Sequence, residues 1–121
     1  TAEIALAQAV QALSAGCAVV IVAPGAAAPA GPVIAAGAPL AVFDGTLAPG
    51  DVEHLDGIDV VAAAGRSDWT RALRNALAAR KGAIIPLETA IIGPSRYVVE
   101  RHLCIDTTAA GGNASLLAAA E

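Results

Sequence analysis

The sequence predicts an α/β fold: a Rossmann-like three-layer sandwich with a mostly parallel sheet. Two observations predict it. Short runs of β-branched and apolar residues alternate along the chain with segments of helical spacing, which is typical of parallel βαβ units. The chain also has 121 residues, enough for a single hydrophobic core and therefore for one compact domain.

The predicted strands are apolar runs without polar alternation, as expected for strands that are buried on both faces. They cover residues 17–22, 40–43, 58–63, 83–87 and, as a long final strand, 97–106. Cys17 falls in the first of these runs and is expected to belong to the core.

The first third of the chain carries one clear helix signal and one open question. Residues 2–15 predict a helix that Gly16 ends. Its apolar residues at helical spacing are Ile4, Val10 and Leu13. The Ala/Gly/Pro-rich residues 23–39 hold either a short helix around 33–36 or a connector.

Two further helices are predicted in the second half. Residues 49–55 form a short helix with acidic side chains in its first turn, where the helix dipole favours them. Ser67 or Asp68 caps a longer helix that Gly82 ends. The apolar face of this helix consists of Trp69, Leu73, Ala76 and Leu77.

Charge and composition argue against several classes of function. The net charge is -4 and the seven Lys and Arg residues form no patch, so we expect no nucleic-acid binding. Gly and Pro interrupt every long apolar run, so we expect no membrane insertion. The two cysteines lack metal-ligand spacing, which favours a reducing cytoplasm and no metal site. The start at Thr1 suggests a piece of a longer polypeptide.

Residue chemistry supplies no convincing active site, so we predict no catalytic and no cofactor-binding residue. Glu88 is the best-placed carboxylate, yet an acid in a loop after a strand is usually solvated, and no second carboxylate pairs with it. His102 and Cys104 share a face of the final strand but lie roughly 6.5 Å apart along it, so a packed cysteine is the better interpretation. The residues after the first predicted strand, 23–29, lack both common phosphate-loop spacings. The alternative function is a free-standing nucleotide- or anion-binding module that uses the Gly65-Arg66-Ser67 turn, which opens a helix but holds a single glycine.

The last stretch, residues 104–117, has the composition of a segment that docks onto a partner. It combines flexible glycines with hydrogen-bonding side chains and ends in two leucines. We therefore divide the chain into a Rossmann-like domain, residues 1–103, and a C-terminal strand and tail extension, residues 104–121. The predicted docking residues are Asp106, Thr107, Thr108, Ala109, Ala110, Gly111, Gly112, Asn113, Ala114, Ser115 and Leu116.

Three stretches, residues 17–24, 40–45 and 57–67, resemble the cofactor domain of aldehyde dehydrogenases. Residues 104–117 look like the C-terminal motif of the long proline utilization A proteins. That resemblance implies a parent enzyme with an FAD-dependent proline dehydrogenase and an NAD-dependent glutamate-semialdehyde dehydrogenase. It further implies that this chain is a non-catalytic lid and assembly domain, whose partner is the catalytic aldehyde dehydrogenase domain of the same polypeptide and which closes the substrate channel.

Departures from the aldehyde dehydrogenase pattern agree with a non-catalytic role. Glu88 falls near the family's general base, but Thr89-Ala90-Ile91 stands where Gly-Gly-Lys should follow. The turn at Gly65 lacks the Phe-Thr that precedes the glycine in active members. The resemblance therefore implies that FAD and NAD belong to the parent protein and that neither is bound by this domain.

Overall fold

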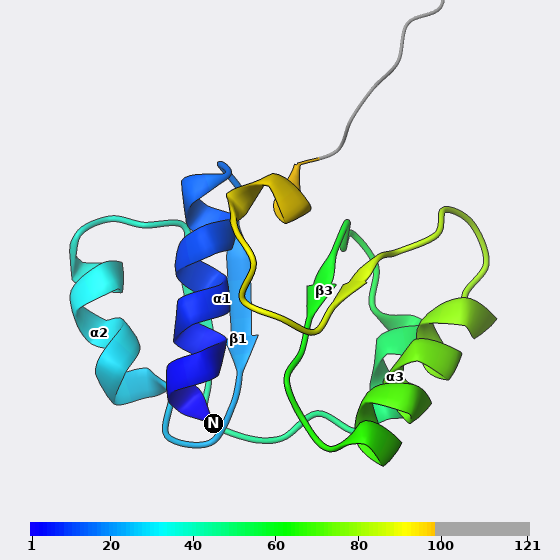
Figure 1. The fold of residues 1–121 in the computed structure, drawn as a ribbon. Coiled ribbons are helices and arrows are strands. Elements are labelled where there is room, and N and C mark those ends of the chain that lie inside the picture. Colours follow the sequence, from blue (N-terminus) through cyan, green and yellow to red (C-terminus); the bar gives the residue numbers. More distant parts are fainter. Residues whose placement is uncertain (99–121) are drawn as a thin grey trace, which may run out of the picture.

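The computed structural model describes residues 1–98. Its elements, with η denoting a 3-10 helix, are α1 (Ala2–Ser14), β1 (Val19–Val22), α2 (Ala27–Ala35), β2 (Leu40–Phe43), η1 (Pro49–His54), β3 (Val61–Ala62), α3 (Ser67–Ala79), β4 (Leu87–Glu88) and η2 (Pro94–Tyr97). The strands form two separate parallel pairs, β1–β2 and β3–β4. Figure 1 shows β1 beside α1 and α2, and β3 on the side of α3. The α/β class is confirmed, whereas the described residues do not form the single sheet of a three-layer sandwich.

The first half of the chain packs two helices on one face of the β1–β2 pair. Val19 pairs with Leu40 and Val22 with Phe43, so side chains directly opposite one another point to the same face. Ile21 and Leu40 lie on the covered face and are buried together with Ala9 of α1, Ala30 of α2 and Ala26, the residue before α2. Within residues 1–98, the opposite face of this strand pair is exposed. The expectation that β1 is buried on both faces is therefore wrong, because Val20 and Val22 are 63% and 38% exposed.

Helix α1 has the predicted extent but buries a different face. Its buried residues are Gln8, Ala9 and Ala12, whereas Val10 is 47% exposed. Alanine lets a helix approach a sheet closely, so the small-residue face of α1 packs inward and the larger aliphatic side chains lie at its margins.

The open question at residues 23–39 is answered by α2, which is longer than the short helix considered. Ala30 is fully buried, and its N–H donates to the carbonyl of Ala26 one turn earlier. Pro32 lies inside α2 and is exposed. A run of small residues thus forms a thin helix that packs tightly against α1 and the sheet.

The second half has its own core, between α3, η1 and the β3–β4 pair. Leu73, Ala76 and Leu77 of α3 are buried against Val52 of η1 and Ala63 after β3, as the apolar spacing of α3 predicts. The predicted cap is wrong, because the N-cap residue is Arg66 and it makes no side-chain cap hydrogen bond.

The later strands differ from their predicted bounds. The third is confined to Val61–Ala62, and the fourth lies at Leu87–Glu88 rather than 83–87. Tyr97 was expected to begin a strand but ends η2. Residues 99–106 of that predicted strand and the predicted tail, residues 104–121, lie outside the described residues.

Candidate functional site

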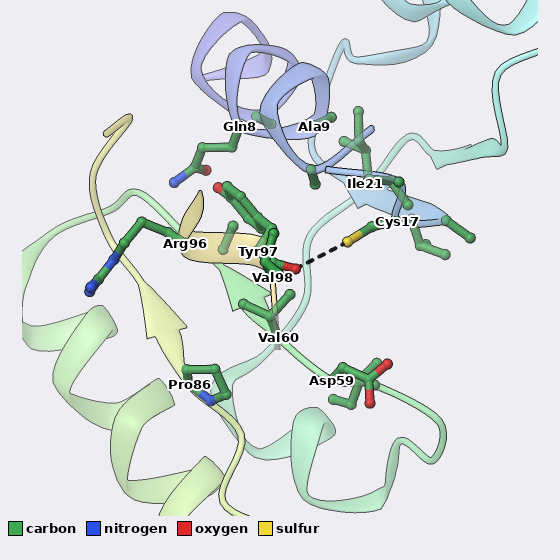
Figure 2. Close-up of a pocket in the computed structure, with 18 of the residues that line it drawn as sticks. Gln8, Ala9, Cys17, Ile21, Asp59, Val60, Pro86, Arg96, Tyr97 and Val98 are labelled. Carbon is green, nitrogen blue, oxygen red and sulfur yellow. Dashed lines mark hydrogen bonds between the residues drawn. The ribbon is translucent and has the colours of Figure 1, made fainter. Parts of the chain in front are cut away.

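A cavity of about 690 Å³ lies between the two halves of the molecule. Its walls come from β1, from the segment that leads into β3, from α1 and from η2. Figure 2 shows side chains from all these elements around one space, with Gln8 on α1 and Tyr97 on η2. Most of the lining is aliphatic, so the few polar groups decide what the cavity can hold.

Two buried polar side chains in this cavity wall lack hydrogen-bond partners among the described residues. Gln8 is 4% exposed and Tyr97 is 6% exposed. The Nε2 amide of Gln8 and the hydroxyl of Tyr97 are both without a partner, and in Figure 2 the Tyr97 ring extends toward the helix that carries Gln8. A buried polar group without a partner costs about 1–3 kcal/mol. The cavity therefore offers hydrogen bonds that something else can accept.

The environment of Tyr97 keeps its hydroxyl protonated. Burial raises the pKa of Tyr97 above its usual value of 10.0, and the nearby Glu88 carboxylate and the Cys17 thiol raise it further. At neutral pH the phenol is therefore a neutral hydrogen-bond donor and acceptor, and it is a poor general base.

Cys17 does not occupy the buried core position expected of it. It lies just before β1, is partly exposed and lines the cavity. Its thiol donates a hydrogen bond to the carbonyl oxygen of Tyr97, with a distance of 3.5 Å (Figure 2). This contact holds the end of η2 beside the start of β1.

The expectation of a solvated Glu88 is wrong. Glu88 lies in β4, is 7% exposed and forms a two-pronged ion pair with Arg96. Arg96 Nη2 lies 3.1 Å from Glu88 Oε1, and Arg96 Nε donates to Oε2 at 3.2 Å. An arginine held in this way neutralises the carboxylate, so Glu88 anchors η2 to β4 and is not a free base.

The Gly65-Arg66-Ser67 turn is filled by its own neighbours. A Cβ at Gly65 would lie 2.9 Å from Cε3 of Trp69, so the indole ring packs where a side chain would project. Asp68 pairs with Arg66 at 3.3 Å and accepts a hydrogen bond from the N–H of Trp69 at 3.0 Å. A carboxylate already sits at this helix N-terminus, which argues against an anion site there.

The remaining candidate residues divide into those the structure describes and those it does not. His54 is exposed at the end of η1. Across residues 1–98, no three His, Cys, Asp or Glu side chains are placed to hold a metal ion. His102, Cys104 and the predicted docking residues 106–116 lie outside the described residues.

No helix in the described part of the chain is long and apolar enough to cross a membrane.

The sequence alone did not indicate the cavity or its two polar side chains. One feature of the sequence could have indicated Gln8: its amide side chain lies on the face of α1 that carries the alanines, one helical turn before Ala12. Tyr97 is the one tyrosine of the chain, but its sequence context predicts a strand. Neither residue type indicates a site without knowledge of what surrounds it.

Two curated proteins are similar to this chain over 64 aligned residues. The Bifunctional protein PutA of Escherichia coli (strain K12) is 45% identical, and the Bifunctional protein PutA of Salmonella typhimurium (strain LT2) is 44% identical. Each match covers 49% of this chain and 5% of the relative, so about half of this chain is similar to a small segment of a much longer protein. No protein-family model matches the chain, and no solved structure matches it.

Proposed function

We propose that this chain is a non-catalytic lid and assembly domain of a bifunctional proline catabolic enzyme. The parent would oxidise proline with FAD and then oxidise glutamate semialdehyde to glutamate with NAD. The observation that carries the proposal is the 45% identity to PutA over half of this chain. The resemblance of residues 104–117 to the C-terminal motif of long proline utilization A proteins adds to it.

The geometry of residues 1–98 supports a role without chemistry. The turn where a nucleotide phosphate would sit holds Trp69 and Asp68. The carboxylate where an aldehyde dehydrogenase carries its general base is neutralised by Arg96. A scaffold of the aldehyde dehydrogenase type that has lost both features can still cover a neighbouring domain.

The open face of the β1–β2 pair is the surface we assign to that neighbour. Val20, Val22 and Phe43 share this face and are 63%, 38% and 62% exposed. Three large apolar side chains gathered on one uncovered sheet face are typical of an interaction site. The proposed occupant is the catalytic aldehyde dehydrogenase domain of the same polypeptide.

A lid acts by excluding water and by slowing the escape of the intermediate. In the proposed arrangement, residues 106–116 extend onto the catalytic domain, where main-chain hydrogen bonds to a sheet edge supply affinity. The hydroxyl and amide side chains of this segment would line the channel wall. The terminal leucines would anchor it.

The test is deletion of residues 107–117 from the full-length enzyme. Proline oxidation is followed by reduction of a dye and coupled flux by NADH formation from proline. We expect coupled flux to fall several-fold while proline oxidation is unchanged. A matched control replaces residues 107–117 by a Gly/Ser segment of equal length, which keeps the chain length and removes the motif. Equal loss of both activities, or full coupled flux in both variants, refutes the lid role.

The competing nucleotide-binding module makes a different prediction. Because the Trp69 ring contacts Gly65, a phosphate bound in the Gly65-Arg66-Ser67 turn would change the fluorescence of this single tryptophan. We expect no saturable change when NAD is titrated into the protein at micromolar concentrations. A saturable response that is abolished by Arg66→Ala would establish the module instead.

A further inference from the structure

The sequence holds two Asp-Gly pairs, Asp44-Gly45 and Asp56-Gly57, and both aspartates are exposed. An Asp-Gly pair can rearrange without an enzyme, because glycine has no Cβ that hinders the approach of its nitrogen to the preceding carboxyl carbon. The reaction requires these two atoms to come within about 3–3.5 Å of one another in an aligned geometry. The surroundings of each carboxylate therefore decide which pair reacts.

The carboxylate of Asp44 is held by a hydrogen bond. Asp44 directly follows β2, and its Oδ1 accepts a hydrogen bond of 2.6 Å from the N–H of Gly25, in the turn after β1. This bond joins the carboxyl ends of two neighbouring strands, and the charge of the acceptor strengthens it. Ring closure at Asp44 turns its carboxyl group toward its own main chain, which breaks the bond to Gly25.

Asp56 has no such anchor in the described part of the chain. Among residues 1–98, its carboxylate pairs with no cation, and the main chain of residues 56–60 makes no hydrogen bond. Gly57 has a φ of 72°, in the left-handed region that glycine adopts freely. An exposed segment without main-chain hydrogen bonds opens locally at low cost. Asp56 therefore reaches the reactive geometry more easily than Asp44.

The segment that carries Asp56 is fixed on both sides. Before it, Val52 is 1% exposed, and its carbonyl oxygen accepts a hydrogen bond from the guanidinium of Arg80. After it, Val61 pairs with Leu87 in the β3–β4 pair. Residues 57–60, between these two points, line the cavity. A change in main-chain length at Asp56 therefore alters the connection from η1 to β3 and one wall of the cavity.

We propose that Asp56-Gly57 is a site of spontaneous isoaspartate formation and that Asp44-Gly45 is protected by its bond to Gly25. The main-chain nitrogen of Gly57 attacks Cγ of the protonated Asp56 carboxyl group. The N–H proton and the carboxyl hydroxyl leave as water, which closes a succinimide ring. Water then cleaves the bond from this nitrogen to the main-chain carbonyl carbon of Asp56, which gives isoaspartate and a main chain one methylene longer. Cleavage of the bond to Cγ restores aspartate. The proposal does not depend on the lid role.

The test is prolonged incubation of the full-length protein in neutral buffer, followed by peptide mapping that separates isoaspartate from aspartate. We expect isoaspartate to accumulate roughly five-fold faster at Asp56 than at Asp44, because one net hydrogen bond slows ring closure by about this factor. The Asp44-Gly45 pair is thus an internal control with the same reacting groups. Incubation in concentrated urea removes the fold, and the two rates should then converge.

A matched variant confirms the assignment of the modified residue. Asp56→Glu moves the carboxyl group one methylene further from the glycine nitrogen, so it should remove the signal at this position and leave the rate at Asp44 unchanged. Absence of isoaspartate at Asp56 in the folded protein, or a rate at Asp44 that equals or exceeds it, overturns the proposal. A difference that persists in urea also overturns it, because the neighbouring residues and not the fold would then set the two rates.

Discussion

Substitution of Gly65 by alanine distinguishes a packing role of this turn from a phosphate-binding role. The new Cβ would lie 2.9 Å from Cε3 of Trp69, inside the 3.4–4 Å of ordinary van der Waals contact. Trp69 packs against the core of α3 and η1, so the ring has little room to withdraw. Overpacking of this kind costs about 1–3 kcal/mol.

The unfolded chain offsets part of this cost. Replacing glycine by alanine lowers the conformational entropy of the unfolded chain, which raises the free energy of unfolding by about 0.4–1 kcal/mol. We therefore expect the free energy of unfolding to fall by about 0.5–2 kcal/mol on balance. The assay is urea denaturation followed by fluorescence of Trp69, the single tryptophan of the chain.

Matched variants locate the cause. Gly31 lies in α2, and a Cβ added there would meet no other atom within 4 Å, so Gly31→Ala should stabilise the protein by about 0.5–1 kcal/mol. Trimming the ring with Trp69→Leu should remove most of the penalty of Gly65→Ala. If Gly65→Ala is as stable as the unaltered protein, the contact with Trp69 does not explain this glycine.

Three further predictions concern the core, the buried ion pair and the tyrosine. Leu73→Ala should lower the free energy of unfolding by about 2–5 kcal/mol in thermal or urea denaturation, since Leu73 is 1% exposed; a loss below about 1 kcal/mol would contradict its core position. Arg96→Ala leaves the Glu88 carboxylate buried without its cation and should cost about 1 kcal/mol, a moderate value because Arg96 is half exposed; no change would mean that the pair contributes nothing. Absorbance titration of the single tyrosine should give a pKa above 10.0. The folded state holds this proton more tightly than the unfolded state. The resulting contribution to the free energy of unfolding is therefore complete below about pH 10 and declines as the pH rises through the pKa of folded Tyr97. This decline should be absent in Tyr97→Phe, and a pKa at or below 10.0 would contradict the burial.

Local patterns predicted most helices of the fold. Alanine-rich residues before Gly16 and the apolar spacing around Leu73 predicted α1 and α3 nearly to their ends, because helix signals are contained within one segment. The face that α1 buries was not predictable in the same way. The buried face depends on which side chains allow close contact with the sheet. In α1 the alanines and Gln8 lie on that face, and Val10 does not.

The strands and the candidate site depended on distant residues. The sequence predicts a solvated loop at Glu88 because its partner, Arg96, lies eight residues further along and reaches it only once η2 packs on α1. The fourth strand was predicted at residues 83–87, but it lies at Leu87–Glu88 because pairing with β3 fixes its register. The cavity is formed by four elements spread across the chain, so no single segment indicates it.

The most direct test of the lid role is the fate of the intermediate between the two reactions. With proline as substrate, the full-length enzyme is assayed in the presence of an amine reagent that traps pyrroline-carboxylate in solution. We predict that little trapped product forms with the intact enzyme and that removal of residues 107–117 raises it several-fold at unchanged proline oxidation. Equal trapping with and without these residues would contradict the proposal that this chain closes the channel.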